Sequence, residues 1–194
     1  MYFFTADFHF GNSDIIEREA RPFKDMKEME DVIVNNINSE ASKDDTLFVL
    51  GDWINYSTIY HSDISVFEVC RRINPSIVLI IGNGEQRFMK DVFNGDFEKM
   101  RRELKEMGIA EVLWDYDVEF GGEKFHLIHR PEDRKEGCLN LFGHTHRSTG
   151  LWKPFGLNVG TDLNHFRPFS GTEILRLLEK KRRWWDNDKS VNCL

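Results

Sequence analysis

Short runs of apolar residues alternate along the first half of the chain with longer stretches in which apolar residues recur every three or four positions. The short runs have the length of strands, and they predict buried strands at Tyr2–Thr5, Thr46–Leu50 and Ile77–Ile81. The longer stretches predict amphipathic helices at Lys27–Asn38, Ile64–Ile73 and Phe88–Met107. Strands that alternate with helices indicate an α/β fold class.

The second half of the chain is richer in predicted strands. Two adjacent glycines, Gly121 and Gly122, allow a tight turn, so the flanking segments Val112–Phe120 and Lys124–His129 are predicted to form a hairpin. Two further strands are predicted, at Cys138–Phe142 and Gly156–Val159.

A capping box is the signal for the last helix. Ser170 and Glu173 have the spacing at which each side chain can bond the backbone N–H of the other. The apolar face of the helix that they open is predicted to be Ile174, Leu175, Leu177 and Leu178. From Lys180 to Leu194 the chain is basic and then polar, and we expect the end of this helix and a frayed tail there.

Composition narrows the class of protein. The 194 residues contain no internal repeat or linker, so one domain over residues 1–194 is expected. Lys and Arg number 26 against 33 Asp and Glu, and a net charge of −7 argues against a nucleic-acid coat or a polybasic membrane binder. Apolar residues make up 40% of the chain, which excludes wholesale disorder. No apolar run approaches the roughly 20 residues of a membrane span.

The cysteines and the N-terminus predict a cytoplasmic protein. Cys70, Cys138 and Cys193 form no CxxC pair and leave one cysteine unpaired, which is typical of reduced thiols. The first residues have neither the basic segment nor the cleavage site of a secretory signal.

Histidine, aspartate and asparagine residues gather just past the ends of the predicted strands. Open α/β sheets bind their ligands at this edge, so we expect the side chains to meet there. Seven of them are candidate metal ligands: Asp7, His9, Asp52, Asn83, His129, His144 and His146. Imidazole, carboxylate and amide oxygen suit Mn, Fe, Zn or Ni, and the lack of thiolates argues against a structural zinc site.

Each of these short motifs is weak alone, because an aspartate after a strand often caps a helix or forms a turn. His61, His126 and His165 are accordingly interpreted as ordinary packed or surface histidines. The ordered set carries much more information, and within it Gly143-His144-Thr145-His146 places two imidazoles where they can address two ions.

The ordered set resembles the calcineurin-like metallophosphoesterases, whose pattern runs D-x-H, G-D, G-N-H-D/E, H and G-H-x-H. The match extends from Asp7 to His146 and is nearest to a small bacterial and phage branch of that family. Segments that resemble this branch are Asp7 to Asn12, Arg21-Pro22-Phe23, Asp44-Asp45-Thr46 and Leu157 to Gly160. The resemblance implies a two-sheet β-sandwich flanked by helices, with four layers in the order αββα.

The resemblance also implies a dinuclear metal centre with manganese as the expected metal. Asp7, His9 and His146 would hold the first ion. Asn83, His129 and His144 would hold the second, and Asp52 would bridge the two ions. A water shared by two cations loses a proton readily, and the resulting bridging hydroxide would attack the phosphate. Asp52, Asn83 and His144 are the residues implied to be catalytic.

Two positions depart from the family pattern. Gly84 stands where the family has a histidine credited with helping the leaving group, and Asn12 stands where the branch has its second histidine. A general acid contributes about 10²–10⁴-fold in rate, so its loss slows poor leaving groups most. Some branches that lack this histidine are regarded as phosphodiesterases.

Positive charge for phosphate binding must come from arginines. The predicted substrate-binding residues are Asn12, Arg87, Arg130 and Arg147, while Arg134 and Arg167 are further candidates. For each arginine, the alternative interpretation is a solvated charge on the protein surface. The basic run from Lys180 to Arg183 before Trp184 and Trp185 is interpreted as the end of a helix rather than a nucleic-acid contact.

The leading hypothesis is a metal-dependent phosphoesterase that hydrolyses phosphodiesters of nucleotide type. One alternative is a phosphomonoesterase that acts on nucleotides or phosphoproteins. The other is a metal-binding scaffold that keeps the fold without turnover. The expected partner is a small phosphorylated molecule, with no membrane, and the charge gives no indication of nucleic acid.

Overall fold

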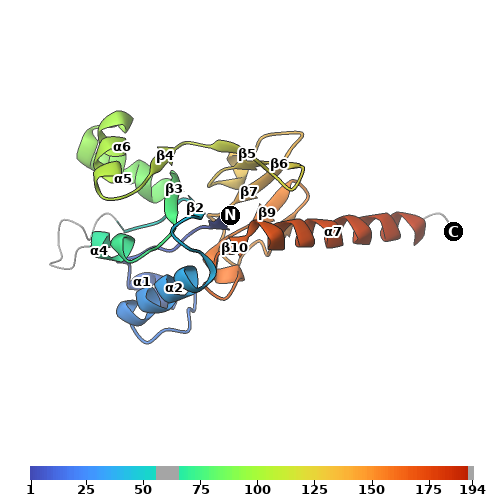
Figure 1. Cartoon of the computed structure of the whole chain (residues 1–194), viewed down its shortest axis with the longest axis horizontal. Helices are drawn as coiled ribbons and strands as arrows, with labels where there is room; N and C mark the ends of the chain where they lie inside the picture. Colours follow the sequence, from blue (N-terminus) through green and yellow to red (C-terminus); the bar gives the residue numbers. More distant parts are fainter. Residues whose placement is uncertain (56–65, 192–194) are drawn as a thin grey trace.

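Two five-stranded sheets form the centre of the structure, a computed structural model that describes residues 1–55 and 66–191 (Figure 1). The first sheet contains β1 (Tyr2–Thr5), β2 (Thr46–Leu50), β3 (Ser76–Ile80), β4 (Glu111–Leu113) and β10 (Phe169–Ser170). Its order is β10-β1-β2-β3-β4, with β1 to β4 parallel and β10 antiparallel at the edge.

The second sheet is mixed and has the order β5-β6-β7-β9-β8. Its strands are β5 (Tyr116–Phe120), β6 (Glu123–Leu127), β7 (Leu139–Phe142), β8 (Trp152–Lys153) and β9 (Gly156–Asn158). The predicted hairpin is present as β5 and β6, which pair antiparallel, with Gly121 and Gly122 both at positive φ in the turn.

Helices flank the sheets. They are α1 (Asp14–Arg18), α2 (Met26–Glu40), α4 (Val66–Arg71), α5 (Asn83–Phe93), α6 (Phe97–Glu106) and α7 (Gly171–Val191), with 3₁₀ turns at Pro131–Asp133 and Thr161–Leu163. The side chain of Asp25 caps α2 by accepting a bond from the N–H of Glu28 at 2.8 Å.

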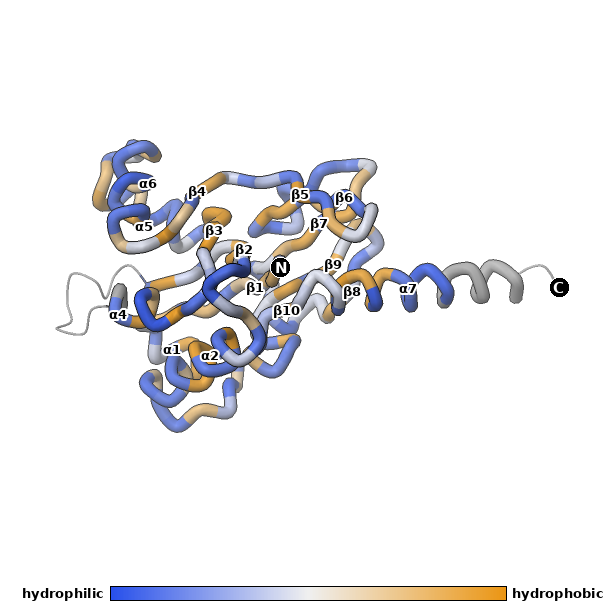
Figure 2. The backbone as a smooth tube through the Cα atoms, viewed as in Figure 1, coloured by the Kyte–Doolittle hydropathy of each residue, from blue (hydrophilic) through white to orange (hydrophobic). Residues whose placement is uncertain are grey.

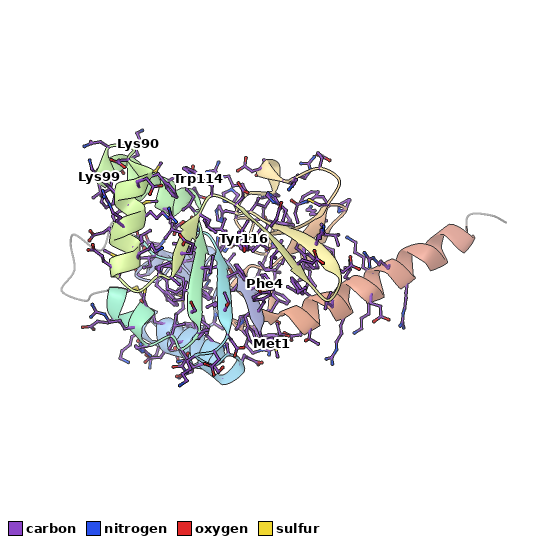
Figure 3. All side chains as sticks on the ribbon, turned by 45° about the horizontal axis from the view of Figure 1, so that its top comes forward. Met1, Phe4, Lys90, Lys99, Trp114 and Tyr116 are labelled. Carbon is purple, nitrogen blue, oxygen red and sulfur yellow. The ribbon has the colours of Figure 1, made fainter. Side chains whose placement is uncertain are left out.

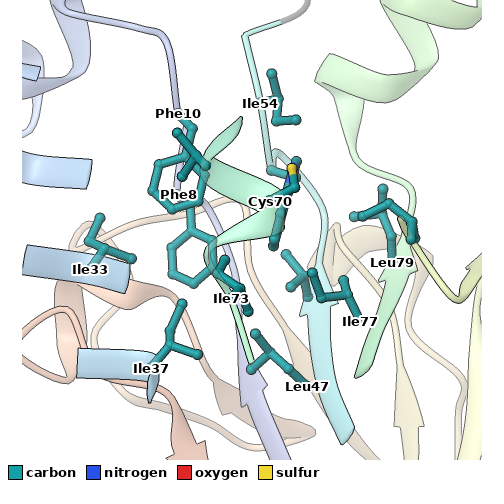
Figure 4. Packing of buried hydrophobic residues seen from close by; sticks show 14 of the residues in the cluster. Phe8, Phe10, Ile33, Ile37, Leu47, Ile54, Cys70, Ile73, Ile77 and Leu79 are labelled. Atoms are coloured by element: carbon teal, nitrogen blue, oxygen red, sulfur yellow. The ribbon is translucent and has the colours of Figure 1, made fainter. Parts of the chain in front are cut away.

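Side chains alternate between the two faces of the first sheet and build two cores. Leu47 and Leu79 face the helices and belong to the same buried cluster as Ile33 and Ile37 of α2 (Figure 4). Figure 2 shows the same division, with apolar central strands and helices that are polar on part of their surface.

The opposite face of the first sheet packs against the second sheet. Phe4 and Phe48 stack at 5.2 Å between ring centroids and meet Phe125 and Leu141 in a second buried cluster. Figure 3 shows Phe4 inside the molecule and Lys90 and Lys99 on its outside. The expected fold class, mixed α/β with two sheets flanked by helices, is therefore confirmed.

The stretch Phe88–Met107 was predicted to be one helix, and this is wrong. Asn94 has a left-handed backbone with φ of 52°, and Gly95 follows with φ of 82°, so α5 ends and Asp96 caps a new helix. The regular apolar spacing continues through the break because both helices pack on the same core.

The stretch Val112–Phe120 was predicted to be one strand, but it supplies two strands in different sheets. β4 pairs with β3 in the first sheet, and β5 pairs with β6 in the second. Trp114 and Asp115 connect them, and an apolar pattern does not indicate that a chain changes sheet.

The last helix begins as predicted. The Glu173 carboxylate accepts a bond from the Ser170 N–H at 2.8 Å, and the Ser170 hydroxyl accepts one from the Glu173 N–H at 3.2 Å. Ile174 and Leu178 are buried, while Leu175 and Leu177 are partly buried. The helix continues to Val191 and so takes up most of the stretch from Lys180 to Leu194 in which the end of the helix and a frayed tail were expected, and it projects from the sheets in Figure 1.

Some sequence features lie outside the described residues: His61, Cys193 and the first two residues of the predicted helix Ile64–Ile73. Among the described residues of that predicted helix, Val66–Arg71 form α4. Within the described part of the chain, no helix is long and apolar enough to cross a membrane.

Candidate metal centre

The candidate ligands lie where the strands of both sheets end. Asp7 follows β1, Asp52 follows β2, and Asn83 follows β3 at the first position of α5. His129 follows β6, and His144 follows β7. A parallel bridge between Ala6 and Gly160 joins the two sheets at this edge. The topology thus brings distant motifs to one place, as expected for an α/β ligand site.

Asp7, His9 and His146 form the first group of donors. One ligand atom from each side chain lies within 4.8 Å of the others, which is close enough to share an ion. The rings of His9 and His146 are nearly parallel, with centroids 5.3 Å apart.

The second group consists of Asp52, His129 and His144. One ligand atom from each of these side chains also lies within 4.8 Å of the others. Asn83 joins this group because its Oδ1 lies 2.9 Å from His129 Nε2. Of the four side chains, Asn83 and His144 are half-buried, and both line the open side of the site.

Asp52 lies between the two groups. Its Oδ2 is 3.6 Å from His9 Nε2 in the first group, and its Oδ1 is 3.8 Å from His129 Nε2 in the second. Each oxygen therefore faces a different group, which is the arrangement that a bridging carboxylate requires.

Two histidines are held in the orientation that metal ligands need. His129 Nδ1 lies 2.7 Å from the carbonyl of Leu50, and His146 Nδ1 lies 2.8 Å from Asp162 Oδ2. Each Nδ1–H donates to its oxygen, so Nε2 carries the lone pair and points into the site.

Most of the candidate ligands have a left-handed backbone. Positive φ occurs at Asp7 (62°), His9 (55°), Asp52 (51°), His144 (70°) and His146 (44°). This conformation is uncommon outside glycine and persists where the surroundings enforce it. Backbone bonds do so here: the N–H of Asp7 donates to the carbonyl of Gly51 at 3.1 Å, and that of His9 to the carbonyl of Asp52 at 3.0 Å.

The chemistry of the donor set fits divalent cations. Burial raises the pKa of Asp7 to about 8 and lowers the pKa of His9 to about 3, so isolated charges are unfavourable here. His9 Nε2 is buried without a hydrogen-bond partner. A bound cation would occupy that lone pair and offset the cost of a buried carboxylate.

A cleft of about 600 Å³ opens from the two groups. At its inner end lie His9, Asp52, Asn83, His144 and His146. Its walls include Asn12, Arg18, Glu19, Ile54, Asn55, Gly84, Arg87, Phe88, Asp91 and Val92. Of the predicted substrate-binding residues, Asn12 and Arg87 thus line the cleft.

Arg130 and Arg147 are placed differently from the prediction. Arg147 points its guanidinium at the backbone carbonyls of Asp162 and Glu19, both at 3.4 Å, and is not among the residues that line the cleft. Arg130 lines a separate cavity of about 170 Å³. Burial and the nearby charge of Arg130 lower the pKa of His144, so this guanidinium still lies close to the second group.

No protein-family model matches the chain. An uncharacterised protein from Methanocaldococcus jannaschii is 27% identical over 188 residues, covering 92% of this chain and 91% of that protein. Among solved structures, a protein of unknown function from Aquifex aeolicus has a TM-score of 0.67 at 22% identity, covering 91% of this chain and 98% of that one. The structural match shows a shared fold.

Two phosphoesterase structures are more distant. An archaeal phosphodiesterase has a TM-score of 0.44 at 15% identity and covers 82% of this chain and 81% of that one. The phosphoesterase Yfce from E. coli has a TM-score of 0.39 at 16% identity, and the match covers 82% of this chain and 77% of that one. At these scores the activity of this chain must be argued from its own site.

Sequence reasoning missed the acidic residue that fixes the loop around Asp52. The buried carboxylate of Glu85 accepts bonds from the N–H groups of Asp52 (3.0 Å), Trp53 (3.0 Å) and Gly82 (2.7 Å). Burial and the charge of Asp52 raise the pKa of Glu85 to about 7. The sequence feature that could have indicated this role is the position of Glu85 in the segment Gly82-Asn83-Gly84-Glu85. In the sequence, Glu85 was considered only as the last residue of that motif.

Gly84 lies against the bridging carboxylate. Its N–H donates to Asp52 Oδ1 at 2.7 Å, and its backbone is outside the left-handed region. A Cβ atom at this position would lie 3.1 Å from Asp52 Oδ1, so a side chain would require a small shift of Asp52.

The other arginines and histidines considered in the sequence lie away from the cleft. Arg134 packs over the Phe155 ring, and Arg167 pairs with Glu40 at 2.7 Å. His126 is buried in β6, and its Nδ1 lies 2.7 Å from Asp117, its cross-strand partner. His165 is exposed, as a surface histidine would be.

Proposed function

We propose that this chain is a metal-dependent phosphoesterase of the calcineurin-like kind, with a dinuclear centre. The observation that carries the proposal is the position of Asp52, whose two oxygens face His9 and His129 in separate donor groups. A scaffold has no physical need for two adjoining sets of buried metal ligands, whereas phosphoryl transfer uses paired cations.

Each group has a defined task in this proposal. Asp7, His9 and His146 hold one cation, and Asn83, His129 and His144 hold the other, with Asp52 shared. When bound, the two cations would activate water and neutralise charge on the phosphate oxygens. The Leu50 carbonyl and Asp162 keep His129 and His146 in the ligating tautomer.

Asn12 and Arg87 are the proposed substrate contacts, because both line the cleft beside the donors. Arg130 is retained as a contact for a phosphate at the second group, since its Nε is buried without a partner and its charge lowers the pKa of His144. Arginine suits this role because its fork of donors matches a phosphate. Arg147 instead ties the segment after His146 to two backbone carbonyls.

We propose small phosphodiesters of nucleotide type as substrates and manganese as the metal. A cleft of about 600 Å³ is in the size range of small-molecule sites. Mixed imidazole, carboxylate and amide donors are compatible with manganese. The absence of a CxxC pair in the sequence supports a cytoplasmic location.

The test is hydrolysis of bis(p-nitrophenyl) phosphate and p-nitrophenyl phosphate by purified protein with and without Mn²⁺. We expect Mn²⁺-dependent hydrolysis that favours the diester and stops with chelator. Preference for the monoester would support a phosphomonoesterase. Metal binding without turnover of either substrate would support the scaffold and contradict the proposal.

A further inference from the structure

Two arginines line the cleft from different helices. Arg18 is the last residue of α1, and Arg87 lies one turn along α5 from Asn83. In the view of Figure 1, α1 and α5 lie on opposite sides of α4. The cleft therefore has a guanidinium on each of two walls.

Both guanidinium groups are available to a ligand. Arg87 is exposed and, among the described residues, forms no hydrogen bond or ion pair. Arg18 has one polar contact in the same part of the chain, a long one of 3.4 Å from Nε to Glu19, and its side chain is 55% exposed. Its two terminal nitrogens remain free to donate.

The cleft is not simply electropositive. Glu19, Asp52 and Asp91 also line it, so its three carboxylates outnumber the two arginines. A general positive field is thus absent, and selectivity must come from short bonds between the guanidinium groups and a ligand. The N–H donors of two guanidinium groups in one cleft suit a compact anion with several oxygens.

Part of the lining of this cleft is apolar. Ile54, Phe88 and Val92 line the same cleft, and Val92 is 36% exposed. These side chains give the cleft an apolar part that can contact the carbon portion of a ligand carrying anionic groups.

We propose that Arg18 and Arg87 bind a second phosphate group of the substrate, so that the preferred substrates are phosphate esters of compounds that carry another phosphate. This inference rests on the proposed function, because the first phosphate occupies the inner end of the cleft. Arg18 is then a specificity-determining residue that the motifs did not indicate.

The test uses two phosphonates that cannot be hydrolysed, propylphosphonate and propane-1,3-diyl bisphosphonate. Their dissociation constants are measured by calorimetry on the Mn²⁺-loaded full-length protein. We expect the bisphosphonate to bind wild type at least about tenfold more tightly, the effect of one charge-assisted hydrogen bond. Arg18→Gln should reduce this ratio to about threefold or less, and Arg18→Lys should retain part of it.

Arg102→Gln is the matched control. Arg102 is an exposed arginine on α6 that lines neither cavity and has no polar partner among the described residues, so this variant should keep the wild-type ratio. Equal affinity of wild type for both phosphonates, or an unchanged ratio in Arg18→Gln, would overturn the inference while the proposed function stands. Failure of both phosphonates to bind, together with no diester hydrolysis, would overturn the proposed function and the inference with it.

Discussion

Arg21 and Asp162 form a buried bidentate ion pair beside the first group of donors. Nε of Arg21 lies 2.8 Å from Oδ1 of Asp162, and Nη2 lies 2.9 Å from Oδ2, with both side chains 0% exposed. Arg21 also donates to the carbonyls of Asp7 and Phe8, and Asp162 accepts the bond from His146. One ion pair thus fixes two of the proposed ligand segments.

Asp162→Asn should weaken both the fold and the metal site. The variant leaves the charge of Arg21 buried and unpaired, which costs about 3–5 kcal/mol of unfolding free energy. It also removes the carboxylate that orients His146, and such changes reduce metal affinity by about 10–100-fold. Urea unfolding and Mn²⁺ titration measure the two effects. Glu123→Gln, which breaks the exposed Glu123–Arg182 pair, is the control and should cost about 0–1 kcal/mol. Wild-type metal affinity in Asp162→Asn would contradict this role.

Gly51 and Gly95 offer a matched pair of substitutions. Their φ values are 83° and 82°, so alanine meets the same backbone strain of about 1–2 kcal/mol at both positions. A Cβ at Gly51 would lie 2.3 Å from His129 Nδ1, whereas a Cβ at Gly95 meets nothing within 4 Å. Gly51→Ala should therefore lose much more stability than Gly95→Ala and also bind Mn²⁺ more weakly. Equal effects in thermal unfolding and metal titration would show that the close approach to His129 is unimportant.

The strands that the sequence predicts best are those bounded by polar residues. Thr46–Leu50 agrees with β2 at both ends because an apolar run ends there at Gly51 and Asp52. The break at Asn94 was missed, since left-handed asparagine leaves no mark on apolar spacing. The change of sheet within 112–120 was missed because it depends on tertiary pairing.

The candidate ligands could be found from the sequence because their short motifs recur in a fixed order. Their supports could not. Arg21 and Asp162 are separated by 141 positions, and nothing in either segment indicates the partner. Arg147 follows the last ligand in the sequence, yet its side chain bonds to backbone carbonyls. Side-chain direction at such positions depends on packing, which spacing alone does not specify.

Burial of Cys70 predicts a pH dependence of stability. Burial, opposed by the bond from Trp53, raises the pKa of the Cys70 thiol from 9.0 to about 12. The stabilisation is complete below pH 9 and is lost as pH rises, because the unfolded thiol ionises above pH 9 and the folded thiol does not. The loss should be up to about 1.4 kcal/mol per pH unit between pH 9 and 12.

Urea unfolding from pH 8 to 11 checks this dependence. The comparison is between a Cys138→Ser/Cys193→Ser double variant and the same chain with Cys70→Ala added. We expect the added Cys70→Ala to reduce the decline of the unfolding free energy above pH 9. The packing that the substitution removes lowers this free energy by the same amount at every pH, so it does not change the slope. Parallel curves for the two proteins would contradict the burial effect.

Gly84→His should improve hydrolysis of esters with poor leaving groups. Gly84 lies beside Asp52 and outside the left-handed region, so histidine can be accommodated with a small shift. A gain of about tenfold on alkyl esters corresponds to about 1.4 kcal/mol, below the usual contribution of a general acid. Nitrophenyl esters, whose leaving group needs little protonation, should gain less.

Gly84→Ala is the control for that substitution, because it adds the same Cβ contact at 3.1 Å without an imidazole. Both classes of ester should be affected equally in this variant. If the histidine variant also changes both classes equally, strain at Asp52 explains the result and the missing acid does not. Wild-type protein that already cleaves alkyl esters as fast as aryl esters would show that another acid is in place.

The central claim is that Asp52 joins two metal sites into one dinuclear centre, and the most direct measurement is the ratio of bound metal to protein after gel filtration. Wild-type protein equilibrated with Mn²⁺ should retain two ions per chain, whereas Asp52→Ala should lose both together, because each group depends on one of its oxygens. A wild-type ratio of one or zero, or two ions retained by Asp52→Ala, would contradict the account.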